Sequence, residues 1–264
     1  MELRGRTVLL TGATGGIGHA IARAVAARGG SLVLTGRRAD VLEPLAAETG
    51  GRAIACDLSR REDLAGLLDE AGAVDVLVAN AALPGSGLLT SFSEAEIDAA
   101  LDVNLRAPMV LARRLAEPMA ARRSGHMVFV SSLAGKAASG GGAVYSATKF
   151  GLRGFALALR EDLRDDGVGV SVVFPGFIRD GGMFHEAGVR LPRFVGTKSP
   201  DEVAAGVVTA IERNRPEVDV APLGLRAGAA FAGIAPGVSA ALQRRLGGAD
   251  VAAQLERGQR DKRT

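Results

Sequence analysis

The only tyrosine of the chain, Tyr145, is followed four residues later by Lys149, in a segment whose pattern predicts a helix. A four-residue step places two side chains on one face of a helix, within reach of each other. A cation about 4 Å from a phenol, at an effective dielectric near 20, favours the phenolate by roughly 4 kcal/mol. This is about three pKa units, enough to bring the pKa of a tyrosine from ~10 towards ~7, where it can exchange protons during catalysis. The alternative is that the two residues share a helix by chance.

A glycine-rich turn from Thr11 to Gly18 joins the first predicted strand to the first predicted helix. Glycines let a backbone come close to a pyrophosphate, and the free N–H groups at a helix N-terminus favour an anion. A turn that merely punctuates a glycine-rich chain is the alternative, but the strand–turn–helix context favours a dinucleotide site. The residues predicted to bind the cofactor here are Gly12, Thr14, Gly15, Gly16, Ile17 and Gly18.

The end of the second predicted strand indicates which dinucleotide binds. NAD sites of this architecture commonly place an Asp or Glu about 20 residues beyond the turn, where it binds the ribose 2′-hydroxyl. Here the strand ends in Gly36, Arg37 and Arg38, and a guanidinium can hold a 2′-phosphate through paired charge-assisted bonds. The nearby Asp40 precedes an apolar helical pattern and is predicted to be a helix N-cap. NADP is therefore favoured over NAD, with Arg37 and Arg38 as its contacts.

Short aliphatic and β-branched runs alternate with longer helical patterns along the chain. Strands are predicted near 6–11, 31–35, 52–56, 75–79, 126–131, 170–174 and 217–220, and helices near 16–28, 39–48, 60–71, 93–122, 144–166 and 200–213. Strands separated by helices are typical of a parallel sheet covered on both faces, in which ligands bind at the carboxyl ends of the strands. We therefore predict an α/β fold, a doubly wound Rossmann domain with seven parallel strands. Pro108 and Pro118 predict a bend or break within helix 93–122.

Composition and charge predict one domain over residues 1–264, because 47% of the residues are hydrophobic and no tract resembles a linker. Within it, 176–199 has weak periodicity and is predicted to be a mobile insertion, and 222–264 is an apolar and basic extension. Residues 244–264 carry six Lys/Arg and three Asp/Glu, which accounts for the whole net charge of +3. A balanced body with a basic tail does not resemble a nucleic-acid-binding surface, and the tail is predicted to be solvated or disordered.

The sequence also predicts a cytoplasmic protein without a metal site. The single cysteine, Cys56, cannot form an internal disulfide and fits a reducing compartment. The first predicted strand begins almost at once, which leaves no room for a signal peptide, and no apolar run reaches the ~18 residues of a membrane span. No His/Cys/Asp cluster has the spacing of metal ligands.

With these residues established, residues 5–220 resemble the short-chain dehydrogenase/reductase family. The glycine turn is similar to the family's TGxxxGxG, Asn80-Ala81-Ala82 to its NAG motif, and Tyr145 to Lys149 to its YxxxK. Further matches, in the family's order, are Asp57 and Leu58 after the third strand, Asn104, Ser132 at 13 residues before Tyr145, and Pro175-Gly176 after the sixth strand.

The resemblance implies that Asn104, Ser132, Tyr145 and Lys149 are catalytic. Tyr145 would protonate a carbonyl oxygen as hydride arrives from the nicotinamide, and Ser132 would donate to the same oxygen. Lys149 would lower the pKa of the tyrosine and bind the nicotinamide ribose, and Asn104 would hold a water that links Lys149 to solvent. Taken singly, Ser132 could end a strand and Asn104 could cap a helix. Further implied cofactor contacts are Asp57, Leu58, Asn80, Ala81, Tyr145, Lys149, Pro175, Gly176 and Ile178.

Two positions depart from the family pattern. Asp180 stands where the family often has a threonine that binds the nicotinamide carboxamide. An ionised Asp can accept from that amide but offers no donor, which leaves the anchorage of the ring open. Ala82 replaces a glycine, and little effect is expected unless its backbone needs a positive φ.

The implied function is an NADP-dependent oxidoreductase that interconverts a carbonyl compound and a secondary alcohol. A non-catalytic NADP-binding sensor or scaffold is an alternative, against which the intact Ser132, Tyr145 and Lys149 argue. A reductase at a membrane surface is another, because segment 224–246 mixes apolar residues with arginines; packing on the cleft or on a neighbouring subunit would explain the same segment. The resemblance implies a homodimer or homotetramer through the 93–122 and 144–166 helices.

Two apolar segments indicate the substrate class. They would wall a cleft suited to a lipophilic ketone, such as a 3-oxoacyl chain or a steroid-like molecule. Mutual burial, or a subunit interface, is the alternative. The residues are Phe177, Ile178, Met183, Phe184, Val189, Leu191, Phe194 and Val195 in the insertion, and Leu223, Leu225, Phe231, Ile234 and Leu242 in the extension.

Overall fold

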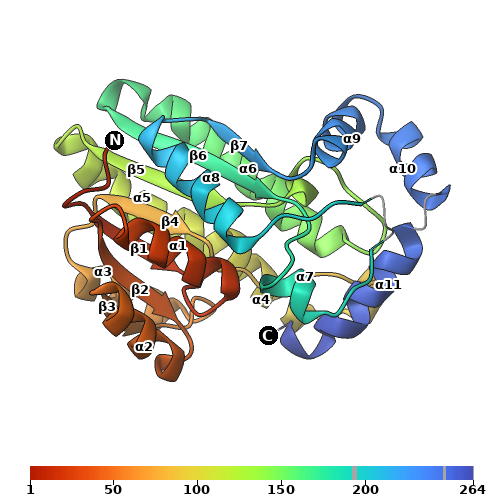
Figure 1. The fold of residues 1–264 in the computed structure, drawn as a ribbon, viewed down its shortest axis with the longest axis horizontal. Coiled ribbons are helices and arrows are strands. Elements are labelled where there is room, and N and C mark those ends of the chain that lie inside the picture. Colours follow the sequence, from red (N-terminus) through yellow and green to blue (C-terminus); the bar gives the residue numbers. More distant parts are fainter. Residues whose placement is uncertain (192–194, 246–247, 264) are drawn as a thin grey trace.

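Seven strands form one parallel sheet at the centre of the protein (Figure 1). The computed structural model describes residues 1–191, 195–245 and 248–263. The strands are β1 (Thr7–Thr11), β2 (Ser31–Gly36), β3 (Arg52–Ala55), β4 (Val76–Ala79), β5 (Gly125–Val130), β6 (Val168–Pro175) and β7 (Glu217–Val220). Their order is β3-β2-β1-β4-β5-β6-β7, and every neighbouring pair is parallel. The predicted doubly wound fold is confirmed, with its switch point between β1 and β4.

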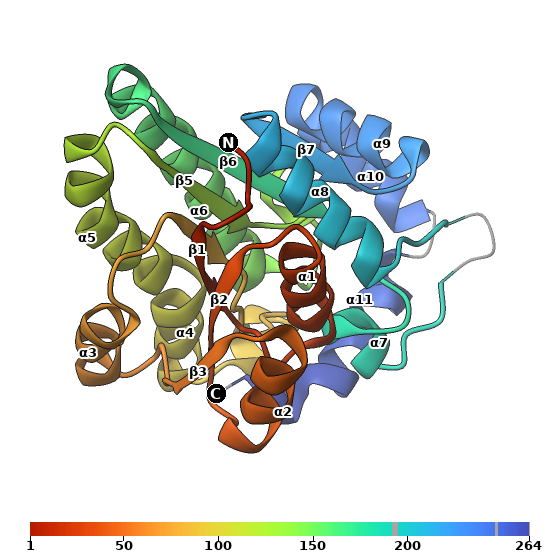
Figure 2. The same ribbon diagram turned by 60° about the vertical axis from the view of Figure 1, so that its left-hand side comes forward.

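Helices cover both faces of this sheet. One face carries α1 (Gly16–Ala26), α2 (Ala39–Thr49) and α8 (Pro200–Glu212), and the other carries α3 (Arg61–Ala71), α5 (Ala107–Ala121) and α6 (Ala143–Asp162). Figure 2 shows α1 and α8 on one side of the sheet and α5 on the other. Successive strand residues alternate between the two cores, as Leu9 and Leu10 do. β5 and β6 are buried along their whole length, which explains their nearly continuous apolar sequences.

The segment predicted as a bent helix over 93–122 is interrupted. α4 (Glu94–Leu101) and α5 are separated by a π-helical segment at Asp102–Arg106. Pro108 has no N–H for the carbonyl of Asn104, four residues earlier, so regular α-helical hydrogen bonding cannot pass this point. The predicted interruption is confirmed, and it lies at Asn104. Pro118 lies inside α5.

The start of α2 differs from the prediction. The helix begins at Ala39 with Arg38 as its N-cap residue, so the prediction that Asp40 is the N-cap is wrong. Asp40 lies in the first turn, where a carboxylate still interacts favourably with the helix dipole.

The C-terminal segment folds into α9 (Leu223–Ile234), α10 (Pro236–Arg245) and α11 (Gly248–Gln259). α11 contacts α7 (Gly182–Glu186), a short helix of the predicted insertion, and the two lie side by side in Figure 1. The predicted disorder of the tail is wrong, because Gly248–Gln259 is helical and Arg263 is 1% exposed. The predicted solvation holds for its other basic side chains, which are exposed at Arg244, Arg245, Arg257, Arg260 and Lys262. In the described part of the chain, no helix is long and apolar enough to cross a membrane.

Candidate active site

The glycine turn is built against the end of β4. Gly12 has a φ of 65°, and a Cβ at this residue would stand 2.6 Å from the Cα of Ala81. The Asn80 amide donates to the carbonyls of Thr11 and Gly12, at 3.1 Å each. The Thr11 hydroxyl accepts from the backbone N–H groups of Asn80 and Ala81. Asn80 and Ala81 therefore hold the turn in shape, and their direct contact with a cofactor stays a prediction.

The N-terminus of α1 is open to an anion. Gly15 precedes the helix without a capping side chain, and a Cβ there would meet only the Gly12 carbonyl, at 3.8 Å. The first N–H groups of α1, which begins at Gly16, are thus available to a phosphate. Gly18 serves packing instead, because a Cβ there would overlap the Gly12 carbonyl and stand 2.8 Å from the Cα of Ala13. The turn fits the pyrophosphate of a dinucleotide.

Arg37 and Arg38 follow β2, and both are exposed. Arg38 donates from Nη2 to the carbonyl of Thr14 at 2.8 Å, so its guanidinium lies at the glycine turn. Asp57, after β3, accepts from the N–H and the hydroxyl of Ser59, at 3.0 and 2.8 Å. These residues line the same edge of the sheet as the turn, which suits the adenosine part of a dinucleotide. Leu58, also predicted as a contact, is 7% exposed.

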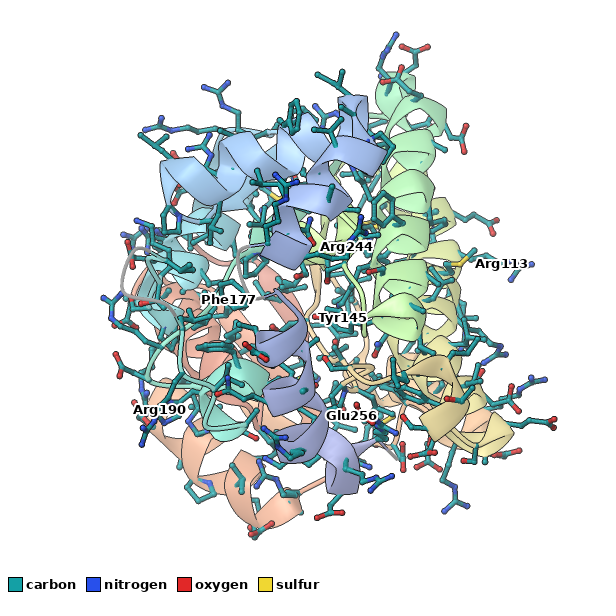
Figure 3. All side chains as sticks on the ribbon, turned by 90° about the vertical axis from the view of Figure 1, so that its right-hand side faces the viewer. Arg113, Tyr145, Phe177, Arg190, Arg244 and Glu256 are labelled. Carbon is teal, nitrogen blue, oxygen red and sulfur yellow. The ribbon has the colours of Figure 1, made fainter. Side chains whose placement is uncertain are left out.

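Ser132, Tyr145 and Lys149 come together near the end of β5. The Ser132 hydroxyl accepts from the N–H of Ala134 at 3.2 Å and lies beside the Tyr145 phenol, where it acts to lower the pKa of the phenol. Lys149, one turn further along α6, has its ammonium 5.6 Å from the centre of the Tyr145 ring. This ammonium donates to the carbonyl of Val130 at 3.0 Å. Figure 3 shows Tyr145 at the start of α6, on the side that faces α11.

Burial dominates the pKa values of this pair. It raises the pKa of Tyr145 to about 12, against a lowering by the Ser132 hydrogen bond. It lowers the pKa of Lys149 to about 8. The expectation that Lys149 brings the pKa of Tyr145 towards neutrality is wrong for this arrangement, because the ammonium donates to the Val130 carbonyl and the partly buried phenol would lose hydration on ionising. Tyr145 is therefore protonated at neutral pH, as a proton donor must be.

Asn104 is completely buried at the break between α4 and α5. Its Oδ1 accepts from the N–H of Leu83 at 2.6 Å, and its Nδ2 donates to the Leu83 carbonyl at 2.9 Å. A longer contact joins Nδ2 to the Thr148 hydroxyl at 3.4 Å. These side-chain contacts are all with the protein, and the water expected at Asn104 stays a prediction.

The segment after β6 reaches back to the start of α1. The N–H of Gly176, which follows Pro175, donates to the Val220 carbonyl at 3.0 Å, and Ile178 is 3% exposed. A Cβ on Gly16 would stand 2.9 Å from the Cα of Gly181. The insertion thus lies against the predicted pyrophosphate site.

Asp180 combines exposure with an unusual backbone conformation. Its φ is 61°, its side chain is 72% exposed, and it pairs with Arg179 at 3.4 Å. Left-handed φ values are uncommon outside glycine, although Asp tolerates them better than most residues.

Ser131 and Gly135 support the site and were not selected from the sequence. The Ser131 hydroxyl donates to the Lys149 carbonyl at 3.0 Å, and a Cβ at Gly135 would stand 2.7 Å from the same oxygen. They hold α6 against the end of β5. The adjacent Ser131 and Ser132 at the end of β5 are the sequence signal that could have identified Ser131. In the described ranges, no group of three His, Cys, Asp or Glu side chains could hold a metal ion.

Known proteins share this sequence pattern and fold. The family model for short chain dehydrogenase matches residues 6–189. The ketoacyl reductase HetN of Nostoc sp. is 39% identical over 227 residues, which are 83% of this chain and 79% of that protein. The 3-oxoacyl-[acyl-carrier-protein] reductase FabG of Rickettsia prowazekii is 33% identical over 181 residues, 68% of this chain and 75% of that protein.

Solved structures of short-chain dehydrogenases have the same fold as this chain. A short-chain dehydrogenase from Sphingobium yanoikuyae in complex with NADPH aligns with a TM-score of 0.77 at 30% identity, over 88% of this chain and 94% of that one. The family model covers well over half of the sequence. The chain therefore belongs to the short-chain dehydrogenase/reductase family and is an enzyme of that type.

Proposed function

We propose that the protein is an NADP-dependent oxidoreductase that interconverts a carbonyl compound and a secondary alcohol. The observation that carries this proposal is the meeting of Tyr145 with Ser132 and Lys149 at the carboxyl edge of the sheet. The glycine turn lies at the same edge, where ligands of doubly wound sheets bind. Residues 1–264 would act as one NADP-binding domain, in the cytoplasm.

In the reduction direction, the cofactor supplies a hydride. Tyr145 donates a proton to the carbonyl oxygen, and Ser132 donates a hydrogen bond to the same oxygen, which stabilises the negative charge that develops there. Lys149 binds the nicotinamide ribose, and its charge stabilises the tyrosinate that remains after proton transfer. The backbone carbonyl of Asn104, which lacks its helical donor at Pro108, holds the water that links Lys149 to solvent.

NADP is the proposed cofactor, with its 2′-phosphate held by Arg37 and Arg38. Three observations support this: no acid stands at the end of β2, Arg38 lies at the turn, and a structural relative is in complex with NADPH. The pyrophosphate would bind Gly15, Gly16 and Ile17. The adenine would contact Asp57 and Leu58, and the nicotinamide the Pro175–Ile178 segment.

The proposed substrate is a lipophilic ketone, with a 3-oxoacyl chain as the first candidate. HetN and FabG carry ketoacyl and 3-oxoacyl reductase names. The rings of Phe177 and Phe184 pack together at 4.9 Å between centres and offer an apolar wall. Phe194 lies outside the described residues. Leu223 and Ile234 of the extension are 78% and 84% exposed, so they do not bury each other.

A series of 3-oxo substrates of increasing chain length tests the substrate class. Each buried methylene contributes about 0.8 kcal/mol, so kcat/KM should rise roughly fourfold per carbon until the cleft is full. Equal kcat/KM for short and long chains would remove the support for a lipophilic cleft.

A panel of carbonyl compounds, read by the consumption of NADPH, tests the function itself. Tyr145→Phe should lower turnover by about a hundredfold or more, because it removes the proton donor. NADPH affinity, measured by calorimetry, should stay within about twofold, since the ring and Lys149 remain. A sensor or scaffold would bind NADPH and reduce none of the panel. A variant that keeps its turnover would show that Tyr145 is not the acid.

We further propose a homodimer or homotetramer through α4, α5 and α6. A surface groove of about 730 Å³ is lined by Leu101 and Met109, each 38% exposed, and Phe150 is 41% exposed on α6. Sedimentation of the protein and of Met109→Asp tests this assembly, because a charge at a buried interface should dissociate it. A peripheral membrane contact through α9 and α10 is the second candidate, favoured by exposed Leu223 and Ile234 beside Arg226. Sedimentation with anionic vesicles tests it.

A further inference from the structure

Arg263 is the largest of the fully buried side chains, although its sequence context predicts solvation. Its guanidinium enters the loop of residues 84–92, which precedes α4. Nη2 donates to the carbonyl of Ser86 at 2.8 Å, and Nη1 donates to the carbonyl of Ser91 at 3.0 Å. The guanidinium lies 3.8 Å from the centre of the Phe92 ring. These contacts fix the loop to the end of the C-terminal segment.

Two carboxylates balance the buried charge. Glu96 on α4 lies 3.7 Å from the Arg263 guanidinium, and Glu256 on α11 lies 3.9 Å from it. A buried guanidinium is stable only when it is paired and hydrogen-bonded, and Arg263 has both kinds of partner. It is therefore a built joint between α4, α11 and the 84–92 loop.

The 84–92 loop also contacts the backbone of Tyr145. A Cβ at Gly85 would stand 2.9 Å from the N and 3.1 Å from the Cα of Tyr145. Gly87 donates from its N–H to the carbonyl of Gly141 at 2.7 Å, four residues before Tyr145. Gly87 has a φ of 143°, and a Cβ there would overlap the Arg263 guanidinium. The loop thus lies between Arg263 and the start of α6.

The helix that ends near Arg263 is held on its other side by the insertion. Gln259 donates to the Met183 carbonyl at 3.3 Å, and Gln254 accepts from the N–H of Arg190 at 3.0 Å. A Cβ added at Gly141 would stand 3.0 Å from the Cβ of Ala252, so Ala252 of α11 lies against Gly141. Figure 3 shows α11 crossing the front of the molecule, with Phe177 on one side and Tyr145 on the other.

We propose that Arg263 is a positioning residue for the reaction and for substrate selection. By joining α11 to the 84–92 loop, it sets the position of Tyr145 and makes α11 a fixed wall of the substrate cleft. The acyl chain of the substrate runs beside α11 and the Phe177–Phe184 pair. This inference rests on the carbonyl reduction proposed above. The glycine turn is not part of the joint at Arg263. Loosening this joint should therefore raise the KM for the ketone far more than it weakens the binding of the cofactor.

Kinetics of Arg263→Ala test the proposal on the 3-oxo series. The KM for long-chain substrates should rise about tenfold or more, because displacements near 1 Å can cost this much. The dependence on chain length should flatten, while NADPH affinity stays within about twofold. Arg260→Ala removes an exposed arginine from the same segment and is the matched control, with kinetics like the wild type. Arg263→Lys should recover part of the loss, since an ammonium can reach one of the two carbonyls.

A second readout needs no turnover. The chain has one Tyr and no Trp, so its intrinsic fluorescence reports on Tyr145 alone. Acrylamide should quench this fluorescence more strongly in Arg263→Ala than in Arg260→Ala, and amide exchange should quicken over 85–92 and 248–259 but not in β1. If Arg263→Ala does not fold, the double variant Gln254→Ala/Gln259→Ala loosens α11 from the other side and should show the same KM and quenching changes.

Unchanged KM, chain-length dependence and Tyr145 quenching in a folded Arg263→Ala, or in the double variant, would overturn the proposal. A wild-type protein that reduces no carbonyl compound would instead defeat the proposed function. In that case the quenching and exchange comparison still decides whether Arg263 positions Tyr145.

Discussion

The side chain of Asn104 pairs with both backbone polar groups of Leu83, accepting from its N–H at 2.6 Å and donating to its carbonyl at 2.9 Å. Leu83 is two residues from Gly85, which packs on the backbone of Tyr145. Asn104 therefore connects the π-helical break to the loop beside Tyr145. Asn104, which was expected to hold a water, thus also stabilises the loop beside Tyr145.

Asn104→Ala should lower the free energy of unfolding by about 2–5 kcal/mol, because it leaves two buried backbone groups without partners. Urea unfolding measures this loss. Arg106→Ala is the control on the same π-helical segment, since it removes only a partly exposed pair with Asp102 at 3.9 Å and should cost less than about 1 kcal/mol. Similar losses in the two variants would contradict a structural role for the Asn104 amide.

Arg37→Asp should weaken NADP binding by about ten- to hundredfold, because it removes a charge-assisted bond worth roughly 1.5–3 kcal/mol and repels the 2′-phosphate. NAD should bind better, since the new carboxylate can accept from a free 2′-hydroxyl. The ratio of kcat/KM with NADPH to that with NADH measures the switch. An unchanged ratio would transfer the assignment to Arg38, whose guanidinium already lies at the turn.

Carbonyl reduction should slow as the pH rises through about 8. Burial lowers the pKa of Lys149 to about 8, so its positive charge is present below that pH and is lost above it. Tyr145, with a pKa of about 12, remains a proton donor over the same range. A profile of kcat/KM against pH, with NADPH binding followed in parallel, checks this. A rate that stays level well into the alkaline range would separate Lys149 from the chemistry.

Acid should destabilise the fold through His126. This residue of β5 is 2% exposed, its Nε2 bonds to the Ser171 hydroxyl at 2.9 Å, and burial lowers its pKa to about 3. An unfolded histidine titrates near 6.5, so below that pH the unfolded chain takes up a proton that the folded chain refuses. Above pH ~6.5, His126 leaves the free energy of unfolding unchanged. Between pH ~6.5 and pH ~3, it lowers the free energy of unfolding by about 1.4 kcal/mol for each pH unit. The difference in unfolding free energy between wild type and His126→Gln should follow this slope; parallel curves would exclude His126.

The sequence predicted those parts of the molecule that depend on neighbouring residues. Short runs of aliphatic and β-branched residues predicted the strands, and Pro108 predicted the break near Asn104. The burial of Arg263 could not be predicted in this way, because its partner Ser91 is 172 residues earlier in the chain. The pKa of Tyr145 was mispredicted for a similar reason. The spacing of Tyr145 and Lys149 on α6 says nothing about burial, which dominates both pKa values. It also says nothing about the Val130 carbonyl at the end of β5, which binds the ammonium.

The joint at Arg263 has a consequence for the diversification of this protein. Arg263 binds the 84–92 loop through the main-chain carbonyls of Ser86 and Ser91, with longer contacts to the Ser91 hydroxyl at 3.4 and 3.5 Å. Between these two anchors, Leu88 and Leu89 are 64% and 58% exposed. These two residues can therefore be substituted in evolution, or randomised in a library, while α11 stays attached to the 84–92 loop through Arg263.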